Sequence, residues 1–210
     1  MIITYHGLQF VKLQTGDTVV AFNAPSKDSK YKKPSFGADI ALTSINHSDF
    51  NGGASLVRGE KAAFLIEGPG EYEVQGIFIK GLQSESDYAG AKRINTIYHL
   101  SMDGMNVCFL GALSNKTLLT EAKEALSEVD ILFVPIAGDG VLSPSDAYKL
   151  AVSIEPKIII PIQFEKGDKN LKLFLKEGGN EKLDTVDKLT LKRKDLEGRE
   201  ADIVVIEEQG

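Results

Sequence analysis

The change of hydrophobic period near residue 114 constrains the fold of this chain more than any other sequence feature. Before this point, short apolar runs alternate with polar residues and turn pairs, which is typical of β-strands. After it, Leu119, Ala122, Leu126 and Val129 recur at steps of three and four, the spacing of an amphipathic helix. A strand-rich half followed by alternating strands and helices favours two sheets with helices outside them, an α/β sandwich of layers.

The first part of the chain is expected to be a series of strands joined by tight turns. A hairpin over residues 2–24 turns at Gly16-Asp17, and residues 38–45 form a mostly apolar run typical of a strand covered on both faces. Asp103-Gly104 is a second hairpin turn. Further strands are expected at residues 62–68, 71–83, 94–102 and 105–113.

The second part of the chain is expected to consist of alternating helices and strands. Ser143, Pro144 and Asp146 match an N-cap, a proline in the first turn and an acid near the helix N-terminus, so a helix should begin there. Gly178 should end another short helix. The full set of expected elements is a helix over 114–130, a strand over 130–138, a helix after 143, a strand over 156–164, a helix over 170–179 and a closing strand over 201–208.

Size and composition indicate an ordinary globular protein, with one domain over residues 1–210. The 24 Lys and Arg against 30 Asp and Glu give a net charge of −6, which disfavours nucleic acid and anionic membranes as partners. The single cysteine, Cys108, excludes an internal disulfide and fits a reducing compartment. Neither a secretion signal nor a membrane span is evident, so a cytoplasmic location is expected.

The apolar run over 38–45 ends in a polar turn that raises the question of a metal site. A catalytic zinc needs about three protein ligands of His, Cys, Asp or Glu type and an open position. A His-x-His-x-Asp-His loop after a strand would supply most of them for two ions. Here the same frame begins at Ile45, keeps His47 and Asp49, and ends at Phe50.

Several segments together resemble the metallo-β-lactamase fold, and within it small zinc-dependent hydrolases similar to ascorbate-phosphate lactonase. The resemblance covers residues 1–164 and rests on Tyr5, Gly7 and Phe10 and on four further segments. These segments are "GADIALTS", "GPGEYEVQGIFIKG", "NTIYHLSMDGMNVCFLG", and "VDILFVPIAG" with "EPKIIIPIQF". The resemblance implies a four-layer αββα sandwich and, in relatives, a centre of two zinc ions.

Most of the metal-ligand positions that the resemblance implies are substituted. Carried over by position, they fall on Ile45, His47, Asp49, Phe50, Ser86, Ala112 and Gln163. Only His47 and Asp49 match, and the resemblance assigns them to different ions. Asn23 stands where relatives carry an acid that would orient a ligand. Each ion would therefore keep a single protein ligand, and no zinc cofactor is expected.

Two functions are compatible with these residues. The first is a degenerate, non-catalytic protein without the dinuclear zinc centre, with a role in binding a small molecule or protein or in assembly. The alternative is a hydrolase of a phosphoester or lactone, with one metal held by His47, Asp49 and an acid such as Glu85 or Asp87. A metal-free variant of the alternative would use a nearby serine with His47 and Asp49, although no nucleophile-elbow motif is present.

The remaining candidate ligands are interpreted as packing or surface residues. His99 and Cys108 lie within apolar strand patterns, and His6 is interpreted as a surface or hydrogen-bonded residue. The sequence leaves open whether the chain forms a homo-oligomer or pairs with an intact relative.

Overall fold

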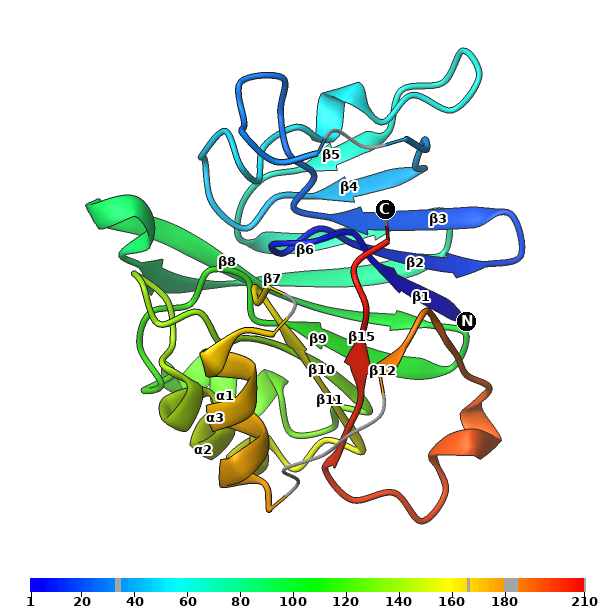
Figure 1. Cartoon of the computed structure of the whole chain (residues 1–210). Helices are drawn as coiled ribbons and strands as arrows, with labels where there is room; N and C mark the ends of the chain where they lie inside the picture. Colours follow the sequence, from blue (N-terminus) through cyan, green and yellow to red (C-terminus); the bar gives the residue numbers. More distant parts are fainter. Residues whose placement is uncertain (33–34, 166, 180–184, 210) are drawn as a thin grey trace.

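The structure, a computed structural model, describes residues 1–32, 35–165, 167–179 and 185–209. Two mixed sheets face each other, and the helices lie on the outer side of one of them (Figure 1). This arrangement confirms the predicted α/β fold with two sheets. No helix within the described residues is long and apolar enough to cross a membrane.

The first sheet has six strands in the order β13-β1-β2-β3-β4-β5. The predicted hairpin is present: β1, β2 and β3 are antiparallel, whereas β4 and β5 run parallel to β3. The strands are β1 (Ile2–Tyr5), β2 (Val11–Thr15), β3 (Thr18–Phe22), β4 (Ile40–Leu42), β5 (Phe64–Ile66) and β13 (Leu189–Thr190).

The second sheet has seven strands in the order β14-β11-β10-β9-β8-β7-β6. Strands β6 to β9 form an antiparallel meander, and β9, β10, β11 and β14 are parallel. The strands are β6 (Gly70–Val74), β7 (Ile77–Ser86), β8 (Arg93–Met102), β9 (Met105–Phe109), β10 (Ile131–Pro135), β11 (Ile158–Ile162) and β14 (Asp202–Ile203). A small separate sheet pairs β12 (Thr185–Val186) with β15 (Val205–Ile206).

Three α-helices cover the outer face of the second sheet: α1 (Thr120–Ala125), α2 (Pro144–Ile154) and α3 (Lys169–Glu177) (Figure 1). The predicted start of α2 is confirmed, because the Ser143 side chain accepts a hydrogen bond from the Asp146 N–H at 3.2 Å. Short 3₁₀ turns occur at η1 (Gly53–Ser55), η2 (Tyr88–Gly90) and η3 (Arg193–Leu196). Within the described residues, η1 and loops rather than an α-helix cover the first sheet's outer face.

The main core lies between the two sheets. Phe22 from the first sheet stacks on Phe109 of the second at a centroid distance of 4.4 Å, and Phe109 in turn contacts Phe133 at 5.9 Å. The buried Tyr98 hydroxyl lies 2.8 Å from the Thr43 carbonyl oxygen and 3.0 Å from that of Ile66, to which it donates. The sheets are therefore held in register by aromatic packing and by a polar contact that crosses the core.

Three predicted elements differ from the structure. The expected single strand over 71–83 is the β6–β7 hairpin, because Gln75 and Gly76 both adopt positive φ and form a tight turn. The expected helix over 114–130 is reduced to α1. The expected strand over 201–208 is divided at Val204, since β14 pairs with β11 while β15 pairs with β12.

Candidate functional site

The sheet topology brings the sequence-predicted site residues to one end of the molecule. Residues 45–50 follow β4 of the first sheet, whereas Ala112 and Gln163 follow the parallel strands β9 and β11 of the second. Loops at the carboxyl ends of neighbouring parallel strands meet at the same sheet edge. The structure therefore places the positions carried over from the family around one common region.

Three of the substituted ligand positions lie in one apolar cluster. Ile45 is 2% exposed, and Phe50 and Ala112 are 0% exposed. They pack with Leu8 and Val141, and we call these five residues the apolar cluster. These side chains are packed together, so the positions that the resemblance assigns to metal ligands contribute hydrocarbon to a buried apolar cluster.

Neutral amides form a hydrogen-bonded chain beside the apolar cluster. The Asn23 amide donates to Ser44 Oγ at 2.8 Å and to Gln9 Oε1 at 2.9 Å. The Gln9 amide donates to Gln163 Oε1 at 2.6 Å, and the Gln163 backbone N–H donates to the Tyr5 hydroxyl at 3.1 Å. Asn23 and Gln163, at positions that the resemblance assigns to an acid and to a metal ligand, are thus hydrogen bonded to neutral groups.

The side-chain amide of Asn95 fixes the loop that contains Ala112. The fully buried Asn95 donates to Ser84 Oγ at 2.8 Å and to the Leu110 carbonyl at 2.9 Å, and its Oδ1 accepts from the Ala112 N–H at 2.8 Å. Gly111, with φ of +63°, passes so close that an added Cβ would lie 2.6 Å from Asn95 Oδ1. Only glycine satisfies both the positive φ and this close approach.

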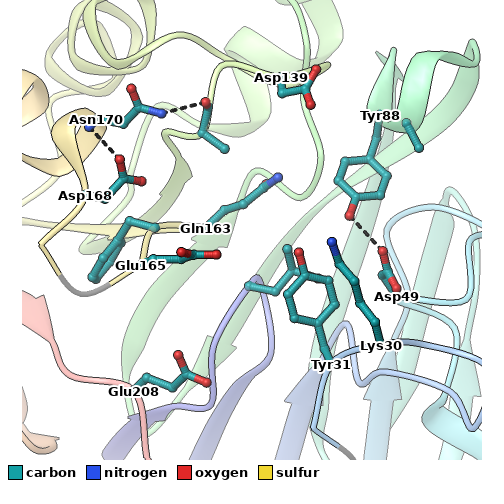
Figure 2. Close-up of a pocket in the computed structure, with 14 residues that line it drawn as sticks. Lys30, Tyr31, Asp49, Tyr88, Asp139, Gln163, Glu165, Asp168, Asn170 and Glu208 are labelled. Atoms are coloured by element: carbon teal, nitrogen blue, oxygen red, sulfur yellow. Dashed lines mark hydrogen bonds between the residues drawn. The ribbon is translucent and has the colours of Figure 1, made fainter.

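Asp49 connects three separate loops. Its Oδ1 accepts from the Ser29 hydroxyl at 2.6 Å, and its Oδ2 accepts from the Tyr88 hydroxyl at 2.8 Å (Figure 2). Burial raises the pKa of Tyr88, and its hydrogen bond to Asp49 raises that pKa further, so the phenol remains the donor. Both carboxylate oxygens of Asp49 are therefore used to hold the structure together.

His47 contacts aromatic rings and the backbone of its own turn. Its Nδ1 accepts from the Asp49 N–H at 3.2 Å, and its ring meets Tyr88 edge-on at a centroid distance of 5.1 Å. Within the described residues no serine hydroxyl is hydrogen bonded to His47. The geometry therefore does not assemble the serine-histidine pair that nucleophilic catalysis requires.

The other candidate ligands lie elsewhere or face away. Ser86 is buried, and its Oγ accepts from the Tyr88 N–H at 3.2 Å. Glu85 and Asp87, its neighbours in sequence, are exposed. In the part of the chain that the structure describes, no group of three or more His, Cys, Asp or Glu side chains could hold a metal ion.

The two remaining histidines and the cysteine belong to the packing. His6 lies within 5.1 Å of the Phe10 ring and 4.9 Å of the Phe36 ring, measured between centroids. His99 is half-buried on β8, where burial lowers its pKa. Cys108 is buried and has a free thiol, whose pKa is raised by burial. The inference that His99 and Cys108 are packing residues agrees with these positions.

A cleft with a volume of about 660 Å³ is lined by Asp49, Tyr88 and Gln163, and it touches the apolar cluster at Leu8. Asp49 and Tyr88 line one side with Lys30 and Tyr31, and Gln163 points in from the end of β11 (Figure 2). The charged groups along its walls are mostly acidic. These are Lys30, Asp49, Asp139, Glu165, Asp168 and Glu208.

The residues at this site do not fit the zinc centre that the family implies. Ile45, Phe50 and Ala112 have no donor atoms in their side chains, and the amide of Gln163 is committed to Gln9. Asp49 is committed to two hydroxyls. Among the residues that the structure describes, those that remain do not supply the three protein ligands of a tetrahedral zinc site.

Some residues that shape this site carried no clear sequence signal. Gln9 and Asn95 lie in strand-like segments where a polar residue is expected at the surface, and only the fold shows that both are fully buried. Tyr88 and Ser29 come from loops far from Asp49 in sequence. Their roles depend on contacts between segments far apart in the sequence, which only the fold shows.

Comparison with known proteins places this architecture in a defined class. A crystal structure named as a candidate Zn-dependent hydrolase of the metallo-beta-lactamase superfamily, from Thermotoga maritima, superposes with a TM-score of 0.73 at 26% identity, covering 98% of this chain and 97% of that one. A candidate metal-dependent hydrolase from Parabacteroides distasonis gives a TM-score of 0.68 at 18% identity, covering 99% and 93%. The fold is therefore the metallo-β-lactamase fold.

The family assignment follows from sequence. A family model described as "Beta-lactamase superfamily domain" matches residues 2–163, so the chain belongs to the beta-lactamase superfamily. The chain is 22% identical over 196 residues to the UPF0173 metal-dependent hydrolase YtkL of Bacillus subtilis, with coverage of 78% of this chain and 86% of that protein. The UPF0173 metal-dependent hydrolase lin1612 of Listeria innocua is also 22% identical, over 200 residues.

Removing the Asp49 carboxylate should loosen the loops that it connects. We expect Asp49→Ala to lower the free energy of unfolding by about 2 kcal/mol, because two hydrogen bonds to a partly buried carboxylate are lost. Urea unfolding followed by circular dichroism measures this change. Asp28→Ala, which removes an exposed carboxylate from the same loop as Ser29, is the matched control and should have little effect. Equal stability of the two variants would contradict the role assigned to Asp49.

His6 should make the protein less stable in mild acid. Burial and the nearby Lys12 and Lys32 lower the pKa of His6 to about 4, whereas it is 6.5 in an unfolded chain. Between these pH values the unfolded state binds more protons, so stability falls as the pH drops from 6.5 towards 4. His6→Phe keeps a ring beside Phe10 and Phe36 and removes the titration. Unfolding free energies measured across this pH range should fall less steeply in the variant; identical slopes would argue against this source of acid sensitivity.

Proposed function

We propose that this chain is a non-catalytic member of the beta-lactamase superfamily that lacks a dinuclear zinc centre and uses its cleft for binding. The observation that carries the proposal is the apolar cluster. Ile45, Phe50 and Ala112 fall at positions that the resemblance assigns to metal ligands, and all three are buried in one cluster with Leu8 and Val141.

Elementary energetics supports this assignment. Burying a phenylalanine side chain stabilises a fold by about 1.5–3 kcal/mol, and a packed cluster has no need of an ion to neutralise it. A family-type ligand set without its metal would place carboxylates and imidazoles close together in a poorly hydrated site. Apolar substitution removes that penalty while the strands that carried the ligands remain in place.

The cleft provides the chemistry for binding. Its 660 Å³ is within the range of small-molecule sites, which span about 300–1,000 Å³. The Tyr31 and Tyr88 rings offer aromatic surface, and Lys30 and the carboxylates on the walls offer polar contacts of both signs (Figure 2). A small molecule or a segment of a protein partner is the class of ligand that we propose.

The alternative proposal is a metal-dependent hydrolase with a reduced site around His47 and Asp49. The names of the relatives favour it, since two are called metal-dependent hydrolases. A phosphoester or lactone substrate would agree with the narrower resemblance to ascorbate-phosphate lactonase. Two points argue against it. Both carboxylate oxygens of Asp49 are already hydrogen bonded, one to Ser29 and the other to Tyr88. Fold similarity by itself also does not establish activity.

Metal content and activity distinguish the two proposals. We expect the protein, purified without chelator, to contain far less than one zinc or manganese ion per chain by elemental analysis. We also expect no hydrolysis of a phosphodiester and lactone panel, with or without added Zn²⁺ or Mn²⁺. The relative YtkL, prepared in parallel, is the control for metal retention, and His47→Ala is the control for activity. One bound ion per chain, or an activity that His47→Ala abolishes, would overturn the non-catalytic proposal.

A further inference from the structure

The edge strand β5 of the first sheet exposes apolar side chains. Phe64 is 51% exposed and Leu65 is 39% exposed, and Val57, just before the short turn that leads into β5, is 49% exposed. At the edge of the second sheet, β6 instead carries the exposed residues Glu71 and Glu73. Charged residues are a common protection of edge strands against pairing, and β5 (Phe64–Ile66) contains none.

The backbone of β5 also has groups available for pairing. The Phe64 N–H donates to the Asp39 carbonyl at 2.8 Å, and the Ile66 carbonyl accepts from the Thr43 N–H at 2.9 Å. Residues 64 and 66 therefore direct their peptide groups to β4 and its flanks. Leu65 lies between them, and peptide groups alternate in direction along a strand. The N–H and C=O of Leu65 therefore point away from β4.

Charges flank this apolar edge in a self-complementary way. Lys61 and Glu67 are both exposed, and neither forms an ion pair within the described residues. They lie three residues before and three residues after Phe64. In an antiparallel pair that places Phe64 opposite Phe64 of a second copy, Lys61 of each chain lies opposite Glu67 of the other.

We propose that the β5 edge, residues 61–67, pairs antiparallel with the β5 edge of a second copy of this chain. The Leu65 peptide groups then bond to those of Ala63 of the second copy, the two Phe64 rings meet at the centre, and Lys61–Glu67 pairs close both ends. A two-fold axis through Phe64 makes the contact self-complementary and closed. This inference does not rest on the proposed loss of catalysis.

The size of the edge sets the expected strength of the dimer. A stable interface buries about 800 Å² on each partner, and a three-residue strand with its flanks supplies only part of this area. Association in the micromolar range is therefore expected. Sedimentation velocity over a concentration series spanning the micromolar range, at low salt, measures it directly.

Charge reversal tests the register. Lys61→Glu should weaken the dimer by about tenfold, because two attractive pairs become repulsive. The double variant Lys61→Glu/Glu67→Lys should restore the affinity to within about threefold of the original, since the pairs are again of opposite sign. Lys172→Glu, an exposed reversal on α3, changes the net charge equally and should leave the dimer unchanged.

A backbone variant tests the edge itself. Leu65→Pro removes an N–H that points away from β4, so the fold should tolerate it, and circular dichroism checks this. The dimer should be lost in this variant. A wild-type protein that stays monomeric throughout the series would overturn the proposal, as would a dimer that Leu65→Pro and Lys61→Glu leave intact. Failure of this proposal has no bearing on the metal measurements above.

Discussion

The packing of apolar side chains at the carboxyl ends of the central strands is the interaction on which the site depends. Ile45 and Phe50 lie in the loop after β4 of the first sheet, and Ala112 lies in the loop after β9 of the second, so their packing joins the two halves of the sandwich. In a metal centre, two cations hold the loops of both sheets together. In the function that we propose, hydrophobic burial supplies this connection instead.

The polar groups beside the apolar cluster are hydrogen bonded to other protein groups. Asn23, Gln9 and Gln163 bond to one another through neutral amides, so these three buried groups carry no charge that an ion would have to balance. Asp49, one of the two ligand-type residues that remain, has its carboxylate bonded to Ser29 and Tyr88. The Asp49 carboxylate thus serves as an acceptor that joins loops, and it also lines the cleft.

The sequence predicted the fold well where hydrophobic periodicity was strong. The buried strands β10 and β11 and the capped helix α2 were anticipated because their apolar runs and the Ser143-Pro144 signal are local. The prediction of a helix over 114–130 was too long, because apolar residues in a loop can also pack against the core. Leu118 precedes α1, yet it lies in the same core cluster as the α1 residue Ala122. Propensity alone does not decide between these outcomes.

The candidate site could be predicted only in part from the sequence. Alignment by motif located Ile45, Phe50 and Ala112, but it could not show that they touch, since contact between β4 and β9 loops is a property of the fold. Gln9 and Asn95 were missed because each is a single polar residue in a strand pattern, and its burial depends on partners distant in sequence. The hydrogen bonds of Asp49 to Ser29 and Tyr88 could not be predicted either, because these two residues lie in separate loops.

The most direct test of the account is the free energy of unfolding with and without metal. An ion that binds the folded state at a hundred times its dissociation constant stabilises it by about 2.7 kcal/mol. If the apolar cluster replaces the ions, unfolding in excess EDTA and in saturating Zn²⁺ should give the same free energy. A loss of stability in EDTA, reversed by adding Zn²⁺, would show that a metal still holds this end of the sandwich together.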